Sequence, residues 1–157
     1  CFSGKIISKI IIMKKLFFNT VCFLMFFIGC NTDPRAINYG HDHCANCDMT
    51  VVDNTHAAQY LTVKGKSFVF DSIECMVMAI NNSHDDKILL SQVLVSDFNN
   101  PGNLITAKFS TFLISEKIKS PMGANLSAFK SYDIAKEIQK EFGGELFNWE
   151  ELKYQLN

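Results

Sequence analysis

The sequence lacks the excess of basic residues that is typical of proteins binding nucleic acids or anionic membranes. Its 157 residues include 15 Lys and Arg against 16 Asp and Glu, a formal net charge of −1 at pH 7. Four lysines and no acidic residue precede Cys30, so the chain from Cys30 onward carries 11 basic and 16 acidic residues, a formal charge of −5. An acidic body argues against a nucleic-acid partner and against a polybasic membrane patch.

The sequence also lacks an apolar run of comfortable membrane-spanning length. The apolar stretch Leu16–Ile28 is shorter than the roughly 20 residues that a transmembrane helix needs. It stands between Met13-Lys14-Lys15 and Gly29-Cys30, as the apolar core of a secretory signal stands between its charged region and its cleavage site. We therefore predict a signal peptide over residues 13–29, with residues 1–12 as upstream translated sequence. An uncleaved anchor helix is the alternative.

The end of this segment, Phe27-Ile28-Gly29-Cys30, resembles a bacterial lipobox. The resemblance implies that Cys30 becomes the lipid-modified first residue of the mature protein. The thiol of Cys30 is then unavailable for metal binding or for a disulfide. Residues 30–40 are polar and show no periodicity, so we expect a tether between the lipid and the folded body.

Cysteine is scarce in the remainder of the chain, which contains only Cys44, Cys47 and Cys75. Three thiols cannot all pair within one chain, so at least one of them is free or binds a ligand. In an exported protein, a free thiol indicates a chemical role.

The segment His41-Asp42-His43-Cys44-Ala45-Asn46-Cys47-Asp48-Met49 gathers two histidines, two cysteines and one methionine. Thiolate and thioether sulfurs select Cu(I), zinc or iron–sulfur clusters over hard cations. Because zinc sites rarely use a thioether, Met49 favours copper. A Cys44–Cys47 disulfide and a small zinc knot are the alternatives. Haem attachment is excluded because Asp48 stands where the motif requires histidine, and a thioredoxin-type motif fits poorly because Thr50–Val52 reads as a strand.

Hydrophobic periodicity predicts a ββαβ unit over about residues 41–97. Its expected elements are strands over 57–63 and 67–70, a helix over 73–80 capped by Asp71-Ser72, and a strand over 88–95. Glu74 follows Asp71 by three residues and reads as the partner in a capping-box variant. Met76 lies on the apolar stripe of this helix, so we expect it to pack in the core.

A second ββαβ unit is predicted over about residues 103–157, after a turn-rich linker at Asp97–Gly102. Its expected elements are strands over 104–108 and 112–115, a turn at 120–123, a helix from a Ser131 cap to Gly143-Gly144, a strand over 145–147 and a helical turn over 149–154. Phe70-Asp71-Ser72-Ile73-Glu74 matches Phe129-Lys130-Ser131-Tyr132-Asp133 in pattern, which suggests a duplication. Units this small rarely fold alone, so we expect the two to share a core.

Taken in order, the lipoprotein signal, the Cys-x-x-Cys-x-Met run and a Pro-Met-Gly turn resemble the NosL family, copper-binding accessory lipoproteins of nitrous oxide reductase. The resemblance runs from about His43 to Trp149. Its matching segments are Cys47-Asp48-Met49, Phe70-Asp71-Ser72-Ile73-Glu74-Cys75-Met76, Val95-Ser96-Asp97, Pro121-Met122-Gly123, Ala128-Phe129 and Gly143-Gly144. The chain departs from the family at Asp48, where glycine is usual; aspartate tolerates the positive φ that glycine suggests.

The resemblance implies an α+β fold of two packed ββαβ units, similar to a unit of the organomercurial lyase MerB. It also implies a Cu(I) chaperone on the periplasmic face of a bacterial membrane. Such a protein would pass copper to apo nitrous oxide reductase with the help of an ABC-type transporter complex. We expect it to act as a monomer.

The same resemblance implies that Cys47 supplies a thiolate to Cu(I) and Met122 a thioether from the second unit. Met49 is a candidate third ligand, and Cys44, Cys75 and His43 are further candidates. The histidines before Cys44 could equally be tether residues without a ligand role.

Two other functions compete with the chaperone. A MerB-like thiol enzyme needs paired thiols beside an acid, and the three cysteines could be arranged that way. However, no nucleophile, base and orienting group can be recognised in the sequence, so we predict no catalytic activity. The second competitor is a structural lipoprotein with a zinc or disulfide knot.

The processing prediction can be tested by mass spectrometry of the membrane fraction. We expect the mature chain to begin at a diacylated Cys30. A mature N-terminus at any other residue, or an unmodified Cys30, would contradict the lipoprotein prediction and would leave the copper prediction standing.

Overall fold

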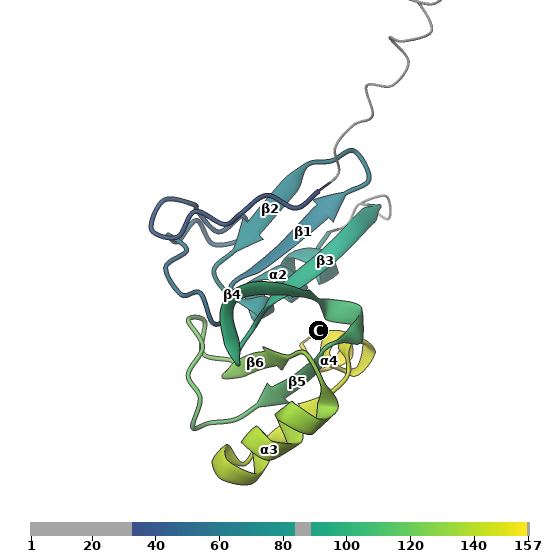
Figure 1. Ribbon diagram of the computed structural model, residues 1–157. Helices are drawn as coiled ribbons and strands as arrows, with labels where there is room; N and C mark the ends of the chain where they lie inside the picture. The colour runs from purple at the N-terminus through teal and green to yellow at the C-terminus, as the bar shows by residue number, and fades with distance from the viewer. Residues whose placement is uncertain (1–32, 84–88, 157) are drawn as a thin grey trace, which may run out of the picture. The chain divides into compact units, whose positions relative to one another are not determined.

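The computed structural model describes residues 33–83 and 89–156, so the signal segment 13–29, Cys30 and His84 lie outside the described residues. The elements are β1 (Ala58–Thr62), β2 (Ser67–Phe70), α2 (Ile73–Asn81), β3 (Leu90–Asp97), β4 (Asn100–Thr106), η2 (Ala107–Phe109), β5 (Thr111–Ile114), β6 (Leu126–Phe129), α3 (Tyr132–Phe142), β7 (Glu145–Phe147) and α4 (Trp149–Gln155), as Figure 1 shows. No helix within the described ranges is long and apolar enough to cross a membrane.

All of these strands belong to one mixed sheet in the order β2-β1-β3-β6-β5-β7, with β4 paired to β3. The pairs are antiparallel except β3–β6, where a parallel pair joins Asp97 to Ala128. Phe98 N–H also donates to the Ala128 carbonyl, at 2.8 Å. The predicted α+β fold is therefore confirmed, and its two ββαβ units, β1-β2-α2-β3 and β5-β6-α3-β7, meet along this parallel pair.

Four segments differ from the sequence prediction. The linker expected at Asp97–Gly102 is instead a tight turn into β4, which includes the first part of the strand predicted over 104–108. That strand was expected in the second unit, but β4 pairs with β3 of the first unit. It tolerates Pro101 because one of its edges needs no backbone donor. Residues 107 and 108, expected to end a strand, belong to the short helix η2 (Ala107–Phe109). The prediction also missed β6, whose four residues are all buried and show no polar alternation. Thr50–Val52 makes a single bridge, from Thr50 to His43, rather than a strand.

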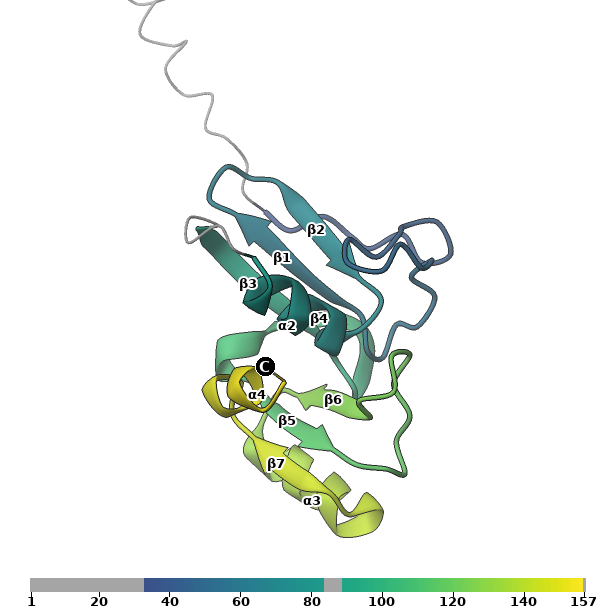
Figure 2. The same ribbon diagram turned by 180° about the vertical axis from the view of Figure 1, so that it is seen from behind.

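The helices cover different parts of the sheet. Helix α2 lies behind β1, β2 and β3 in Figure 1 and in front of them in Figure 2. Its Ile73 and Met76 are fully buried in a core that also contains Phe70, Phe112 and Leu152 of α4. The predicted packing of Met76 is thus confirmed. A smaller core, formed by Leu113, Ile118, Phe129 and Ala135, joins α3 to β5 and β6.

Each ββαβ unit begins its helix with a serine cap of the same geometry. Ser72 has φ −148° and ψ 159°, and Ser131 has φ −143° and ψ 155°. Each serine side chain accepts the backbone N–H three residues later, which satisfies one of the unpaired donors of a helix N-terminus. The capping box expected for Glu74 is wrong, because Ser72 alone caps α2 and the Glu74 carboxylate bonds elsewhere.

Gly144 offers a stability test of the turn after α3. Its φ is +99°, and a Cβ there would lie 2.2 Å from the Ile114 carbonyl oxygen. Gly144→Ala should therefore lower the free energy of unfolding by more than about 2 kcal/mol, measured by urea denaturation. Gly102→Ala is the matched control, because its φ is +83° but no atom lies within 4 Å, and it should cost only about 1–2 kcal/mol. Equal losses would show that the backbone contact is unimportant.

Candidate metal centre

A tight turn presents the first pair of cysteines. Cys44 N–H donates to the Met49 carbonyl at 2.8 Å, and Asp48 N–H donates to the Cys44 carbonyl at 2.9 Å. Asp48 has φ +62°, so the positive φ expected where the family uses glycine is confirmed. Ala45 N–H donates to the Val69 carbonyl at 2.8 Å, which fixes the turn against β2.

The thiol of Cys44 is buried at the centre of this turn. Burial raises its pKa, while amide N–H groups of Asp71, Cys47 and Asn46 point at the sulfur and partly oppose that shift. Amides directed at sulfur favour the thiolate, which is the form that binds metals. In the metal-free protein burial outweighs these amides, so the neutral thiol is favoured until an ion binds.

Cys75 comes to the same place from the first turn of α2. Its N–H donates to the Ser72 hydroxyl at 3.2 Å, which sets the sulfur near the positive end of the helix dipole. Asn46 Nδ2 lies 3.6 Å from Cys75 Sγ. Burial raises the pKa of this thiol, and the neighbouring Asp71 carboxylate raises it further.

Asp71 completes the cluster and was missed as a site residue by the sequence. One ligand atom from each of Cys44, Cys47, Asp71 and Cys75 lies within 4.8 Å of the others, and all three thiols are free. Asp71 is 3% exposed, and its carboxylate lies beside the thiols of Cys44 and Cys75; besides burial, this contact raises the pKa of both thiols. The sequence signal was present but was assigned to helix capping, a role that Ser72 fills alone.

A buried carboxylate is costly unless hydrogen bonds or a cation compensate its charge. Here the carboxylate faces three thiols, so the donor set fits a thiophilic metal ion. Only Cys47 of these four residues is partly exposed, and it therefore marks the side from which an ion can arrive.

The other candidate ligands lie outside this four-residue cluster. His43 is exposed, and its Nδ1 lies 3.0 Å from the Asp48 carbonyl. Met49 is 51% exposed and Met122 is 39% exposed. The ligand roles of these three residues stay predictions.

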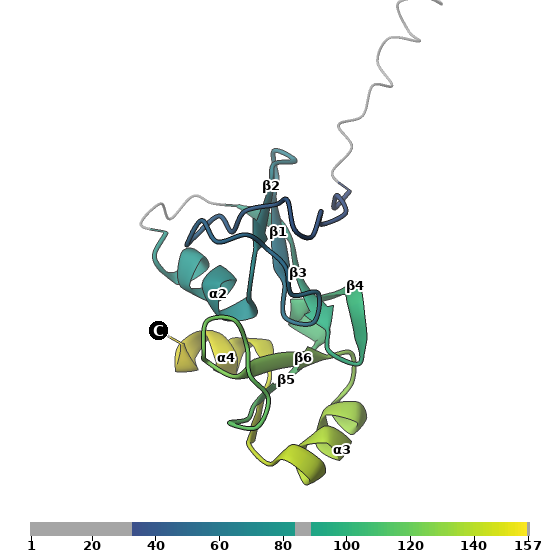
Figure 3. The same cartoon turned by 90° about the vertical axis from the view of Figure 1, so that its left-hand side faces the viewer.

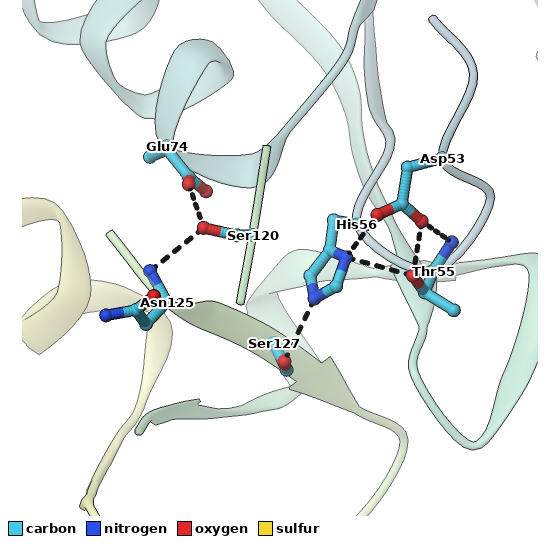
Figure 4. A network of polar contacts seen from close by, with 7 residues as sticks. All are labelled: Asp53, Thr55, His56, Glu74, Ser120, Asn125 and Ser127. Atoms are coloured by element: carbon cyan, nitrogen blue, oxygen red, sulfur yellow. Dashed lines mark hydrogen bonds and ion pairs between the residues drawn. The ribbon is translucent and has the colours of Figure 1, made fainter. Parts of the chain in front are cut away.

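The turn that carries Met122 is nevertheless fixed to the helix that carries Cys75. The Ser120 hydroxyl donates a short hydrogen bond to Oε1 of Glu74, the residue before Cys75, and Figure 4 shows the pair. In Figure 3 the β5–β6 connection rises beside α2, in agreement with this contact. The turn at residues 120–123 of the second unit therefore contacts α2, the helix that carries Cys75.

These features define an α+β protein with a thiol-rich cluster that could hold a metal ion. The sequence profile of the NosL family matches residues 36–156, so the chain belongs to the NosL family. Among solved structures, it is similar to the copper chaperone NosL from Shewanella denitrificans, with a TM-score of 0.63 and 19% identity over 76% of this chain and 95% of that one. No curated protein matches its sequence.

The burial of the thiols predicts an order of alkylation by iodoacetamide in the metal-free, reduced protein. Cys47 should react first because it is partly exposed, while Cys44 and Cys75 are 2% and 0% exposed. The raised pKa of each buried thiol leaves less thiolate near neutral pH, so their reaction should accelerate as the pH rises. Peptide mapping measures the order. Simultaneous labelling of all three cysteines would contradict the buried cluster.

Proposed function

We propose that this protein is a membrane-anchored Cu(I) chaperone that delivers copper during the maturation of nitrous oxide reductase. The observation that carries the proposal is the convergence of three free thiols from two segments of the chain on one buried point. Membership of the NosL family and the similarity to a copper chaperone support copper as the cargo.

The donor atoms suit this cargo. Cu(I) prefers thiolate and thioether sulfur, and it is protected from oxidation when soft ligands surround it. Cys44, Cys47 and Cys75 supply the thiolates, and the family resemblance adds the thioether of Met122. Asp71 places a carboxylate oxygen beside the three sulfurs of this donor set.

Cys47 is the residue at which transfer begins. It is partly exposed, whereas the other two thiols are buried, so a sulfur ligand of a partner reaches the ion beside Cys47 first. Replacement of one ligand at a time releases the ion without exposing it to water. The protein then performs no covalent chemistry on its cargo.

The client and the location are part of the same proposal. A lipid on Cys30 would hold the chain at the periplasmic face, and the tether 30–40 would let it reach apo nitrous oxide reductase and the associated ABC-type transporter complex. The acidic charge of the chain after Cys30 agrees with anchoring by lipid rather than by basic side chains.

A second candidate function is a thiol enzyme that cleaves carbon–metal bonds. The observation that favours it is the Asp71 carboxylate beside two buried thiols, because such an enzyme needs an acid next to paired cysteines. Mercury release from an organomercurial by the metal-free protein would establish this activity. Unchanged organomercurial after prolonged incubation with the reduced protein would exclude it.

Metal titration tests the main proposal. Residues 32–157 form one compact unit, and this part should bind one Cu(I) per chain far more tightly than zinc, in competition with a chromophoric Cu(I) chelator. Firm zinc binding with no copper competition would support the zinc knot instead.

Substitution of single cysteines then tests the transfer residue. Cys47→Ser should lower Cu(I) affinity at least about tenfold, which corresponds to about 1.4 kcal/mol, because it removes an anionic ligand. It should also slow copper transfer to a competing thiol more than Cys44→Ser does, since Cys44 is buried. If Cys44→Ser reduces the rate of copper transfer more than Cys47→Ser does, Cys47 is not the residue at which transfer begins.

A further inference from the structure

Two polar networks join the first ββαβ unit to residues 120–127, and Figure 4 shows both. One links Glu74, Ser120 and Asn125, and the other links Asp53, His56 and Ser127. Both networks cross between the units, but only the first contacts the turn that carries Met122.

The first network is centred on the Ser120 hydroxyl. This hydroxyl donates to Oε1 of Glu74 and accepts the Asn125 N–H at 2.9 Å. Glu74 is 2% exposed and Ser120 is 8% exposed, so water competes little for either group. The Glu74 side chain therefore holds the start of the turn and, through Ser120, its end.

The backbone between these two points has little freedom. Pro121 has a restricted φ, and Gly123 N–H donates to the Ser120 carbonyl at 3.1 Å. Gly123 has φ +82° and Asn125 has φ +56°. Met122, at the tip, is 39% exposed, so the network fixes its backbone while its thioether stays accessible.

We infer that Glu74 and Ser120 are positioning residues that hold the Met122 thioether for the ion bound at the cysteine cluster. Glu74 directly precedes Cys75 in α2, so one helical turn places both a thiol ligand and the anchor of the distant methionine. This inference rests on the proposed Cu(I) function and on Met122 as a ligand. It explains why the Glu74 carboxylate is buried although it takes no part in capping α2.

The second network supplies a matched control. Nδ1 of His56 lies 2.7 Å from Asp53 Oδ2, and its Nε2 lies 3.3 Å from the Ser127 hydroxyl. Ser127 is fully buried in β6 and makes no hydrogen bond to the Met122 turn. Ser127→Ala should therefore weaken the contact between the units without moving Met122.

The test is a double-mutant cycle on the purified full chain, read by Cu(I) competition with a chromophoric chelator. Ser120→Ala should lower Cu(I) affinity about tenfold, a loss of the size expected for one hydrogen bond to a buried charged group. In a Met122→Ala background, the same change should have no further effect, because Ser120 acts through Met122. Ser127→Ala should leave the affinity unchanged.

Two further readouts separate positioning from a general loss of structure. Glu74→Gln keeps an acceptor oxygen for Ser120 and should retain most of the affinity that Glu74→Ala loses. Copper X-ray absorption should show one sulfur ligand fewer in Ser120→Ala, as in Met122→Ala. Circular dichroism confirms that each variant is folded.

The outcomes distinguish this inference from the function on which it rests. Equal losses from Ser120→Ala with and without Met122, or no loss at all, would overturn the positioning role while leaving the chaperone intact. No effect of Met122→Ala would overturn Met122 as a ligand and the inference with it. Absence of Cu(I) binding by the unaltered protein would overturn the proposed function itself.

Discussion

The hydrogen bond from Cys75 N–H to the Ser72 hydroxyl is the constraint on which the metal site depends. It starts α2 at a defined residue and places the Cys75 sulfur at the helix N-terminus. Because Ser72 performs the capping, Asp71 is free to turn its carboxylate toward the thiols, and Glu74 is free to bond Ser120. Because Ser72 caps the helix, both acidic side chains can make contacts other than capping, Asp71 with the thiols and Glu74 with Ser120.

The second ββαβ unit keeps this cap but not the donors. Lys130 and Ile134 stand where the first unit has Asp71 and Cys75, and the Ser131 cap has nearly the same dihedral angles as Ser72. The local fold is thus independent of metal chemistry, since the same strand, cap and helix form with apolar and basic side chains. What the second unit would contribute to the proposed copper site is the Met122 turn, which the hydrogen bond from Ser120 to Glu74 holds against α2.

The sequence predicted much of the fold because caps and helical periodicity are local signals. The Ser131 cap, the start of the first helix after Asp71-Ser72 and the core position of Met76 followed from such signals. The positive φ of Asp48 followed instead from the family resemblance, since glycine is usual at that position. The sequence could not predict β6, since a short, wholly buried strand has no alternation to recognise. It could not predict Asp71 as a site residue either, because that role depends on a tertiary contact between residues 44–47 and the start of α2.

The parallel pairing between β3 and β6 determines how the two ββαβ units would resist being pulled apart. Asp97 and Ala128 form its register pair, whereas the antiparallel pairs on either side each join several residues. A pulling force applied to the two units is therefore concentrated on a short seam, which the polar networks and the shared core reinforce. An ion bound both by the thiols of one unit and by the methionine turn of the other would cross-link the two units at this interface. Removal of the ion would then weaken the interface.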